Sequence, residues 1–271
     1  MENNDEDLKQ WVNKCDDGIQ RWFETEHKYD LGFPLEAYNG KGKTALNREA
    51  LPEPYVGDPL AKRKISAVLL RLNPGPIVPE QQLSNSDQES LYNRVREVRN
   101  GYSETYRFWR DIPQATHDSW KKFAGWASGL SCSGQSSSLN PEESIVGIDL
   151  IPFHSEGYSS GKMKFSKAMS YFQDEIFRIA AKIAKTSHNI VPCQTQSVVL
   201  AVGKNHYDIC KSIFCKPMAC VESDNWEFTL WKYDSGCNIF VARQKKGGGP
   251  VPPGRKHDRI IRSILINKST L

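Results

Sequence analysis

Apolar residues spaced three and four positions apart mark the helical segments of this chain. The first amphipathic stretch covers residues 5–25, where the apolar positions are Leu8, Trp11, Val12, Cys15, Ile19 and Trp22. This spacing places the six side chains on one face of a helix, which predicts that the face is buried. Similar spacing or composition predicts further helices over residues 87–99, 104–111, 166–186, 204–214 and 256–267.

Short apolar runs alternate with these helices and predict strands. They cover residues 65–72, 144–153, 196–203, 225–233 and 238–243, whereas residues 30–60 are rich in Gly, Pro, Asn and Tyr and read as a long ordered loop. Strands that alternate with long helices are typical of α/β proteins. We therefore expect a three-layer α/β sandwich with a central, largely parallel sheet flanked by helices. We divide the chain into an N-terminal helical extension and loop over 1–50 and an α/β domain over 51–271.

Composition narrows the class of protein. The chain has 271 residues, 38% of them hydrophobic, which is enough for one large core. It has no run of about 18 apolar residues and no signal-peptide pattern at its start, so we expect no membrane association. The seven cysteines are odd in number and scattered, which favours reduced thiols and a cytoplasmic location over disulfides or a metal site.

The charge is unevenly distributed along the chain. Residues 1–30 carry nine acidic and four basic side chains, whereas residues 243–262 carry seven basic side chains and one acidic one. A basic segment of this kind can bind a polyanion such as nucleic acid. A solvated surface with no binding role explains the same composition, and charge alone favours that reading.

Polar residues and glycines follow the predicted strands. The apolar run of 68–72 ends at Asn73-Pro74-Gly75-Pro76, and Asp149 lies close to the end of the next strand. Ligands of parallel sheets bind at the carboxyl ends of the strands, so we expect these residues near a site. Read alone, Asn-Pro-Gly also suits an ordinary tight turn.

Four segments in order carry a resemblance to a known family. They are "PEPYVGDPLAKRKISAVLLRLNPGP" (52–76), "TYRFWRDIP" (105–113), "GIDLIPFHS" (147–155) and "LAVGKNHY" (200–207). Together they resemble the uracil-DNA glycosylase superfamily, most closely its mismatch-specific and single-strand-selective branches, over roughly residues 52–262. The resemblance implies that family's α/β fold, with DNA as the partner and no cofactor or metal, and we expect a monomer.

The resemblance also implies a chemistry, the hydrolysis of the bond between a base and its deoxyribose. In this reading the Asn73 amide orients the attacking water, while Pro74 and Gly75 hold the backbone close to the nucleotide. No lysine stands in the nucleophile's place in these motifs. We therefore expect a monofunctional glycosylase that leaves an abasic site.

Asp149 is the position at which the chain departs from the uracil enzymes. The single-strand-selective branch has Asn-x-x-Pro here, whereas this chain has Asp149 three residues before Pro152. An ionised carboxylate only accepts hydrogen bonds and cytosine offers an amino donor, so the change favours a cytosine-type base. The open alternative is that Asp149 caps a turn or pairs with an arginine.

A second departure lies in the last motif. The family's His-Pro-Ser or Asn-Pro-Ser loop is replaced by "RQKKGGGPVPPGRKHD" (243–258). This loop could follow a phosphate backbone through Lys245, Lys246, Gly247, Gly248, Arg255 and Lys256. His154 is a candidate substitute for the missing leaving-group contact, although a lone histidine after a strand is more often structural.

A glycosylase must also receive the flipped base on an aromatic face, for which the candidates are Tyr102, Tyr106 and Phe153. The sequence thus favours a DNA glycosylase for a bulky modified cytosine, and the phage-defence type that acts on glucosylated hydroxymethylcytosine is the resemblance to test first. Two alternatives stay open, namely a repair glycosylase for uracil or another deaminated base, and a catalytically silent nucleic-acid-binding module.

Overall fold

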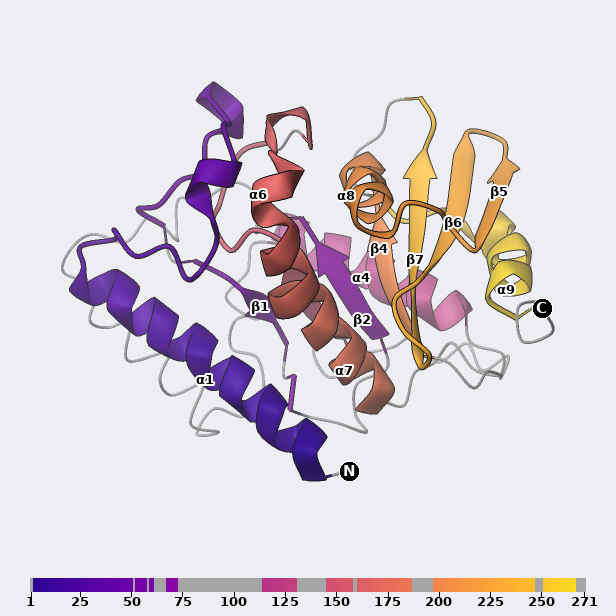
Figure 1. Cartoon of the computed structure of the whole chain (residues 1–271). Coiled ribbons are helices and arrows are strands. Elements are labelled where there is room, and N and C mark those ends of the chain that lie inside the picture. Colours follow the sequence, from indigo (N-terminus) through magenta and orange to yellow (C-terminus); the bar gives the residue numbers. More distant parts are fainter. Residues whose placement is uncertain are drawn as a thin grey trace.

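The centre of the protein is a seven-stranded sheet with helices on both faces (Figure 1). We describe it from a computed structural model, which covers residues 2–50, 52–57, 59–60, 67–72, 114–130, 145–157, 160–186, 197–246 and 251–266. The strands are β1 (Tyr55–Val56), β2 (Ala67–Arg71), β3 (Ile145–Asp149), β4 (Ser197–Val202), β5 (Ala219–Ser223), β6 (Trp226–Lys232) and β7 (Cys237–Gln244).

Four parallel strands form the middle of the sheet. The order is β1-β3-β2-β4-β7-β6-β5; the β3–β2, β2–β4 and β4–β7 pairs are parallel, whereas β1, β6 and β5 each pair antiparallel with a neighbour. The four central strands read as nearly continuous apolar runs because both of their faces are covered. The expected α/β fold with a largely parallel sheet is therefore confirmed.

Helices cover the two faces in separate groups (Figure 1). The first face packs against α1 (Glu2–Glu24), against α6 (Phe165–Ser170) with η6 (Tyr171–Phe177) and α7 (Arg178–Thr186), and against α8 (Lys204–Phe214). The second face packs against α4 (Gln114–Gly129) and α9 (Asp258–Ile266). Alternate residues of β2 divide between the two cores, with Val68 and Leu70 facing the first and Ala67 and Leu69 the second.

The N-terminal helix belongs to the first of these cores. Leu8, Trp11 and Trp22 of α1 are at most 5% exposed and lie in one cluster with side chains of α7 and β3. Burying each such side chain contributes about 1.5–3 kcal/mol to stability. Residues 1–50, expected as an extension, thus share their core with the α/β domain.

The long helix predicted over 166–186 contains an irregularity that periodicity did not reveal. The segment is continuous as α6, η6 and α7, but η6 is a π-helix. The 204–214 and 258–266 helices and the five predicted strands are also confirmed. The helices predicted over 87–99 and 104–111 lie outside the described residues.

Candidate functional site

The carboxyl ends of the four parallel strands lie along one edge of the sheet. Arg71 at the end of β2 is in register with Asp149 at the end of β3, and Val202 of β4 is in register with Ala242 of β7. The residues that follow these strands therefore leave the sheet from the same edge. Leu72 is the last described residue before Asn73, so Asn73, Pro74, Gly75, Tyr102 and Tyr106 lie outside the described residues.

A buried polar cluster occupies this edge, and we call Glu53, Arg71, Asp149 and His154 the carboxyl-edge cluster. Arg71 Nε lies 3.1 Å from Asp149 Oδ1, and an Arg71 terminal nitrogen lies 3.7 Å from Glu53 Oε2. The Nε2 atom of His154 lies 3.6 Å from Glu53 Oε1. Asp149 is fully buried and His154 is 3% exposed, so the cluster is held almost entirely away from water.

Backbone hydrogen bonds fix the cluster from three directions. The N–H of Asp149 donates to the carbonyl of Pro54 at 3.0 Å, and the N–H of Glu53 donates to the carbonyl of Pro152 at 2.8 Å. The N–H of Asn47 donates to the carbonyl of His154 at 2.7 Å. Segments far apart in the sequence thus position the cluster, which explains why sequence patterns indicated Asp149 and His154 but not Glu53 or Arg71.

The protonation state of Asp149 differs from the one expected. Burial raises the pKa of this carboxyl to about 8; Arg71 opposes the rise and Glu53 adds to it. Arg71 does not offset the burial because neither carboxyl oxygen has a well-aligned hydrogen-bond partner among the described residues. The premise of an ionised Asp149 is therefore wrong at neutral pH, where the carboxyl keeps its proton and can both donate and accept. The Arg71 contact is the pairing that the sequence had left open.

His206 is a residue at this edge that the sequence analysis missed. Gly203, with φ of 116°, ends β4 and turns the chain into α8, and the His206 ring then lies back against the strand end. His206 Nδ1 lies 2.8 Å from the carbonyl oxygen of Val202. Because burial lowers the pKa of His206 to about 4, the ring is neutral and Nδ1–H donates this bond. The signal was the histidine four residues after a strand, at a position where a helix begins.

Phe153 lies in the core at this edge. It is 0% exposed, and the guanidinium carbon of Arg48 lies 5.9 Å from its ring centroid. The structure therefore places the ring in the interior, where Arg48 lies over it, and not on a surface open to a base. Of the aromatic residues expected to receive a base, only Phe153 is among the described residues.

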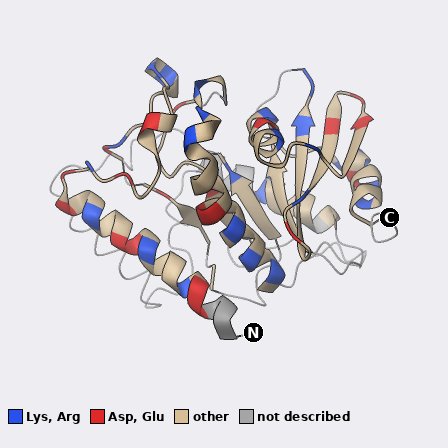
Figure 2. Ribbon diagram, viewed as in Figure 1, with Lys and Arg blue, Asp and Glu red and all other residues tan. Residues whose placement is uncertain are grey.

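The basic segment after β7 is partly neutralised by the β5–β6 hairpin. Lys245 Nζ lies 2.7 Å from Glu222, and Lys256 Nζ lies 2.8 Å from Asp224. Figure 2 shows these opposite charges side by side at the ends of β5, β6 and β7. Of the other residues expected to bind DNA, Lys246 and Arg255 are exposed, whereas Gly247 and Gly248 lie outside the described residues.

Arg243, at the end of β7, is held in a fixed position beside this segment. Its guanidinium carbon lies 3.4 Å from the ring centroid of Tyr207, and two of its nitrogens donate to Glu227 Oε2 at 3.1 and 2.6 Å. Stacking and a fork of two hydrogen bonds leave this side chain little rotational freedom. The guanidinium is therefore pre-positioned near the carboxyl edge.

Comparisons with known proteins and searches for special features do not add a function to this geometry. No family model, curated protein or solved structure matches the chain. Within the described ranges, no group of three or more His, Cys, Asp or Glu side chains could hold a metal ion. None of the helices described is long and apolar enough to cross a membrane.

Proposed function

We propose that the protein is a monofunctional DNA glycosylase that flips out a modified cytosine and hydrolyses its bond to deoxyribose. The observation that carries the proposal is the parallel pairing of β2 with β3, in register at Arg71 and Asp149. Because of this pairing, the segment that begins at Asn73 and the segment that follows Asp149 leave the sheet at the same edge. The segments whose sequences resemble the glycosylase superfamily are thus neighbours in space.

Asp149 supports a role in reading the base. A protonated carboxyl donates one hydrogen bond and accepts another, and the pairing edge of cytosine offers an amino donor beside a ring-nitrogen acceptor. Burial keeps water from competing for these bonds, which strengthens them. Asn73 would orient the water that attacks C1′ of the sugar, and the bonding electrons would leave with the base.

The protonated state of Asp149 favours one second candidate, a repair glycosylase for uracil. The uracil edge offers a ring N–H donor beside a carbonyl acceptor, so a neutral carboxyl can pair with it as well. An ionised carboxylate cannot donate to the uracil carbonyl, whereas it can still accept from the cytosine amino group. Preference for cytosine over uracil should therefore grow as the pH rises through about 8, the pKa of Asp149.

The experiment is a base-release assay on three DNAs that contain unmodified cytosine, uracil or glucosylated hydroxymethylcytosine, each at pH 6 and pH 9. We expect release from the glucosylated DNA, an abasic product and a cytosine-to-uracil ratio that rises with pH. Preferential release of uracil at both pH values would favour the repair enzyme. No release from any DNA, with DNA binding retained, would indicate a catalytically silent binding module.

A further inference from the structure

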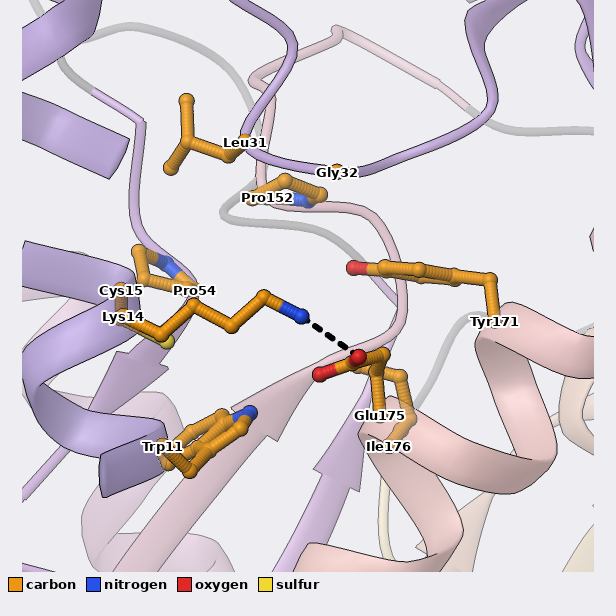
Figure 3. A pocket seen from close by; sticks show the side chains of 10 residues that line it. All are labelled: Trp11, Lys14, Cys15, Leu31, Gly32, Pro54, Pro152, Tyr171, Glu175 and Ile176. Atoms are coloured by element: carbon orange, nitrogen blue, oxygen red, sulfur yellow. Dashed lines mark hydrogen bonds and ion pairs between the residues drawn. The ribbon is translucent and has the colours of Figure 1, made fainter. Parts of the chain in front are cut away.

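A second concave site lies between α1 and the π-helix η6 (Figure 3). Its volume is about 60 Å³, which is room for a few water molecules or for one edge of a small ring. Pro54 and Pro152, which flank the carboxyl-edge cluster in sequence, form part of its wall. We call this site the α1–η6 pocket; it is lined by Trp11, Lys14, Cys15, Leu31, Gly32, Pro54, Pro152, Tyr171, Glu175 and Ile176.

Two polar groups of the α1–η6 pocket have nothing in the protein to bind. Trp11 is 5% exposed, and Figure 3 shows its indole nitrogen and the Tyr171 hydroxyl directed into the hollow. Among the residues that the structure describes, neither group has a hydrogen-bond partner. A buried donor without a partner costs about 1–3 kcal/mol, so both groups favour a polar occupant.

The walls of the pocket are rigid enough to select a ligand. The Trp11 ring packs against Tyr55 with centroids 5.3 Å apart, and the Tyr171 ring packs edge-on against Phe33 at 5.4 Å. Tyr171 and Glu175 both belong to η6. Single π-helical turns occur frequently at functional sites because they re-aim side chains that an α-helix would place elsewhere.

The ion pair at the mouth restricts the charge of the occupant. Lys14 Nζ lies 2.5 Å from Glu175 Oε1, and the two side chains are 58% and 29% exposed. The opposite charges cancel, so neither an anion nor a cation gains net attraction. A charged pair still offers strong donors and an acceptor to a neutral ligand, and the exposed lysine can swing aside to enlarge the opening.

We propose that the α1–η6 pocket binds an uncharged polyhydroxylated ring, that is, a hexose-like sugar. Its C–H faces would pack against Trp11 and Tyr171, while its hydroxyl groups would donate to Glu175 and accept from Lys14 and the Trp11 N–H. An apolar ligand would leave these polar groups unpaired, and a phosphate would be repelled by Glu175. The sugar could be free or attached to a DNA base; the second source rests on the proposed function.

The first arm of the test uses free sugar. Methyl glucoside would be titrated into the full-length protein and its binding followed by saturation-transfer NMR, with cytosine as the competing ring. Glu175→Gln and Tyr171→Phe keep the shape of the site and remove one hydrogen-bonding function each, so each should weaken sugar binding about five- to tenfold. The matched controls are Asp234→Asn, whose ion pair with Lys185 is also 2.5 Å long, and Tyr233→Phe; both lie outside the pocket lining.

The second arm uses DNA that carries hydroxymethylcytosine with or without glucose. If the sugar is attached to the base, the Glu175 and Tyr171 variants should raise KM only for the glucosylated DNA and leave kcat nearly unchanged. Dependence on the pocket in either arm supports the proposal and identifies the source of the sugar. Binding of cytosine in place of sugar, or no dependence on the pocket in both arms, overturns it.

Failure of the pocket and failure of the proposed function can be told apart. If no DNA releases any base but free sugar still binds in a Glu175-dependent manner, only the glycosylase proposal fails. If glucosylated DNA is cleaved with the same KM by the parent and both variants, and free sugar does not bind, the glycosylase proposal stands and the sugar site is overturned.

Discussion

Replacing Asp149 with asparagine should change the pH dependence of folding in a direction opposite to that of most carboxylates. The folded pKa of Asp149 is about 8, whereas the ordinary value of 3.8 applies to the unfolded chain. Between these values the folded state holds a proton that the unfolded state has released. Stability contributed at this position is therefore lost as the pH rises from about 4 to about 8, and not as it falls.

The size of the effect follows from the span of that window. One pH unit corresponds to about 1.4 kcal/mol, so a rise of about four units amounts to at most roughly 6 kcal/mol. Between pH 5 and pH 7 the parent should lose about 3 kcal/mol relative to the Asp149→Asn variant, which has no proton to release. The charged neighbours Arg71 and Glu53 are present in both proteins, so the comparison isolates this carboxyl.

Urea unfolding of the parent and the variant at pH 5, 6, 7 and 8 measures this difference. Asp234→Asn serves as the control, because hydrogen bonds from Lys185 and the Gly236 N–H hold the pKa of Asp234 below its usual value. Asp234 should thus stabilise the fold above pH 4, the opposite sign. If the stability difference between the parent and Asp149→Asn stays constant from pH 5 to pH 8, the carboxyl is ionised in the folded protein and the reasoning is refuted.

Two further predictions concern His206 and the basic segment. Because the folded pKa of His206 is about 4, below the ordinary 6.5, the parent should lose up to roughly 3 kcal/mol as the pH falls from 6.5 to 4, and urea unfolding of His206→Gln should show this loss removed. Replacing Glu222 and Asp224 with their amides should free Lys245 and Lys256, strengthen DNA binding and steepen its dependence on salt by up to about 0.9 for each phosphate gained, as measured by fluorescence anisotropy. Unchanged affinity in that double variant would mean that the segment does not face DNA.

Local patterns in the sequence predicted the elements of the fold that bury a regular face. The helix of α1 and the apolar runs of β2, β3 and β4 were predicted because each alternates or repeats at its own period. The β5 strand was missed because Val221 and its neighbours Cys220 and Glu222 are exposed at the sheet edge, so no buried face marks it. Helix α4 was missed because it mixes glycine and polar residues among its aromatics.

The carboxyl-edge cluster shows what local patterns cannot supply. Asp149 was singled out by its distance from Pro152, but its protonation depends on burial under segments remote in sequence. Glu53 reaches Arg71 and His154 only because the 52–56 segment pairs with β3. The pocket beneath α1 required the same kind of information, since Trp11 and Tyr171 are separated by most of the chain.

The central claim is that the protein hydrolyses a base from DNA with Asn73 orienting the water. Single-turnover base release from DNA containing glucosylated hydroxymethylcytosine, compared between the parent and Asn73→Ala, tests it most directly. We expect the parent to leave abasic sites and the variant to bind DNA equally well but react about 100-fold more slowly, a barrier higher by about 2.7 kcal/mol. Equal rates for the two proteins, or no abasic sites with the parent on any modified DNA, would contradict the account.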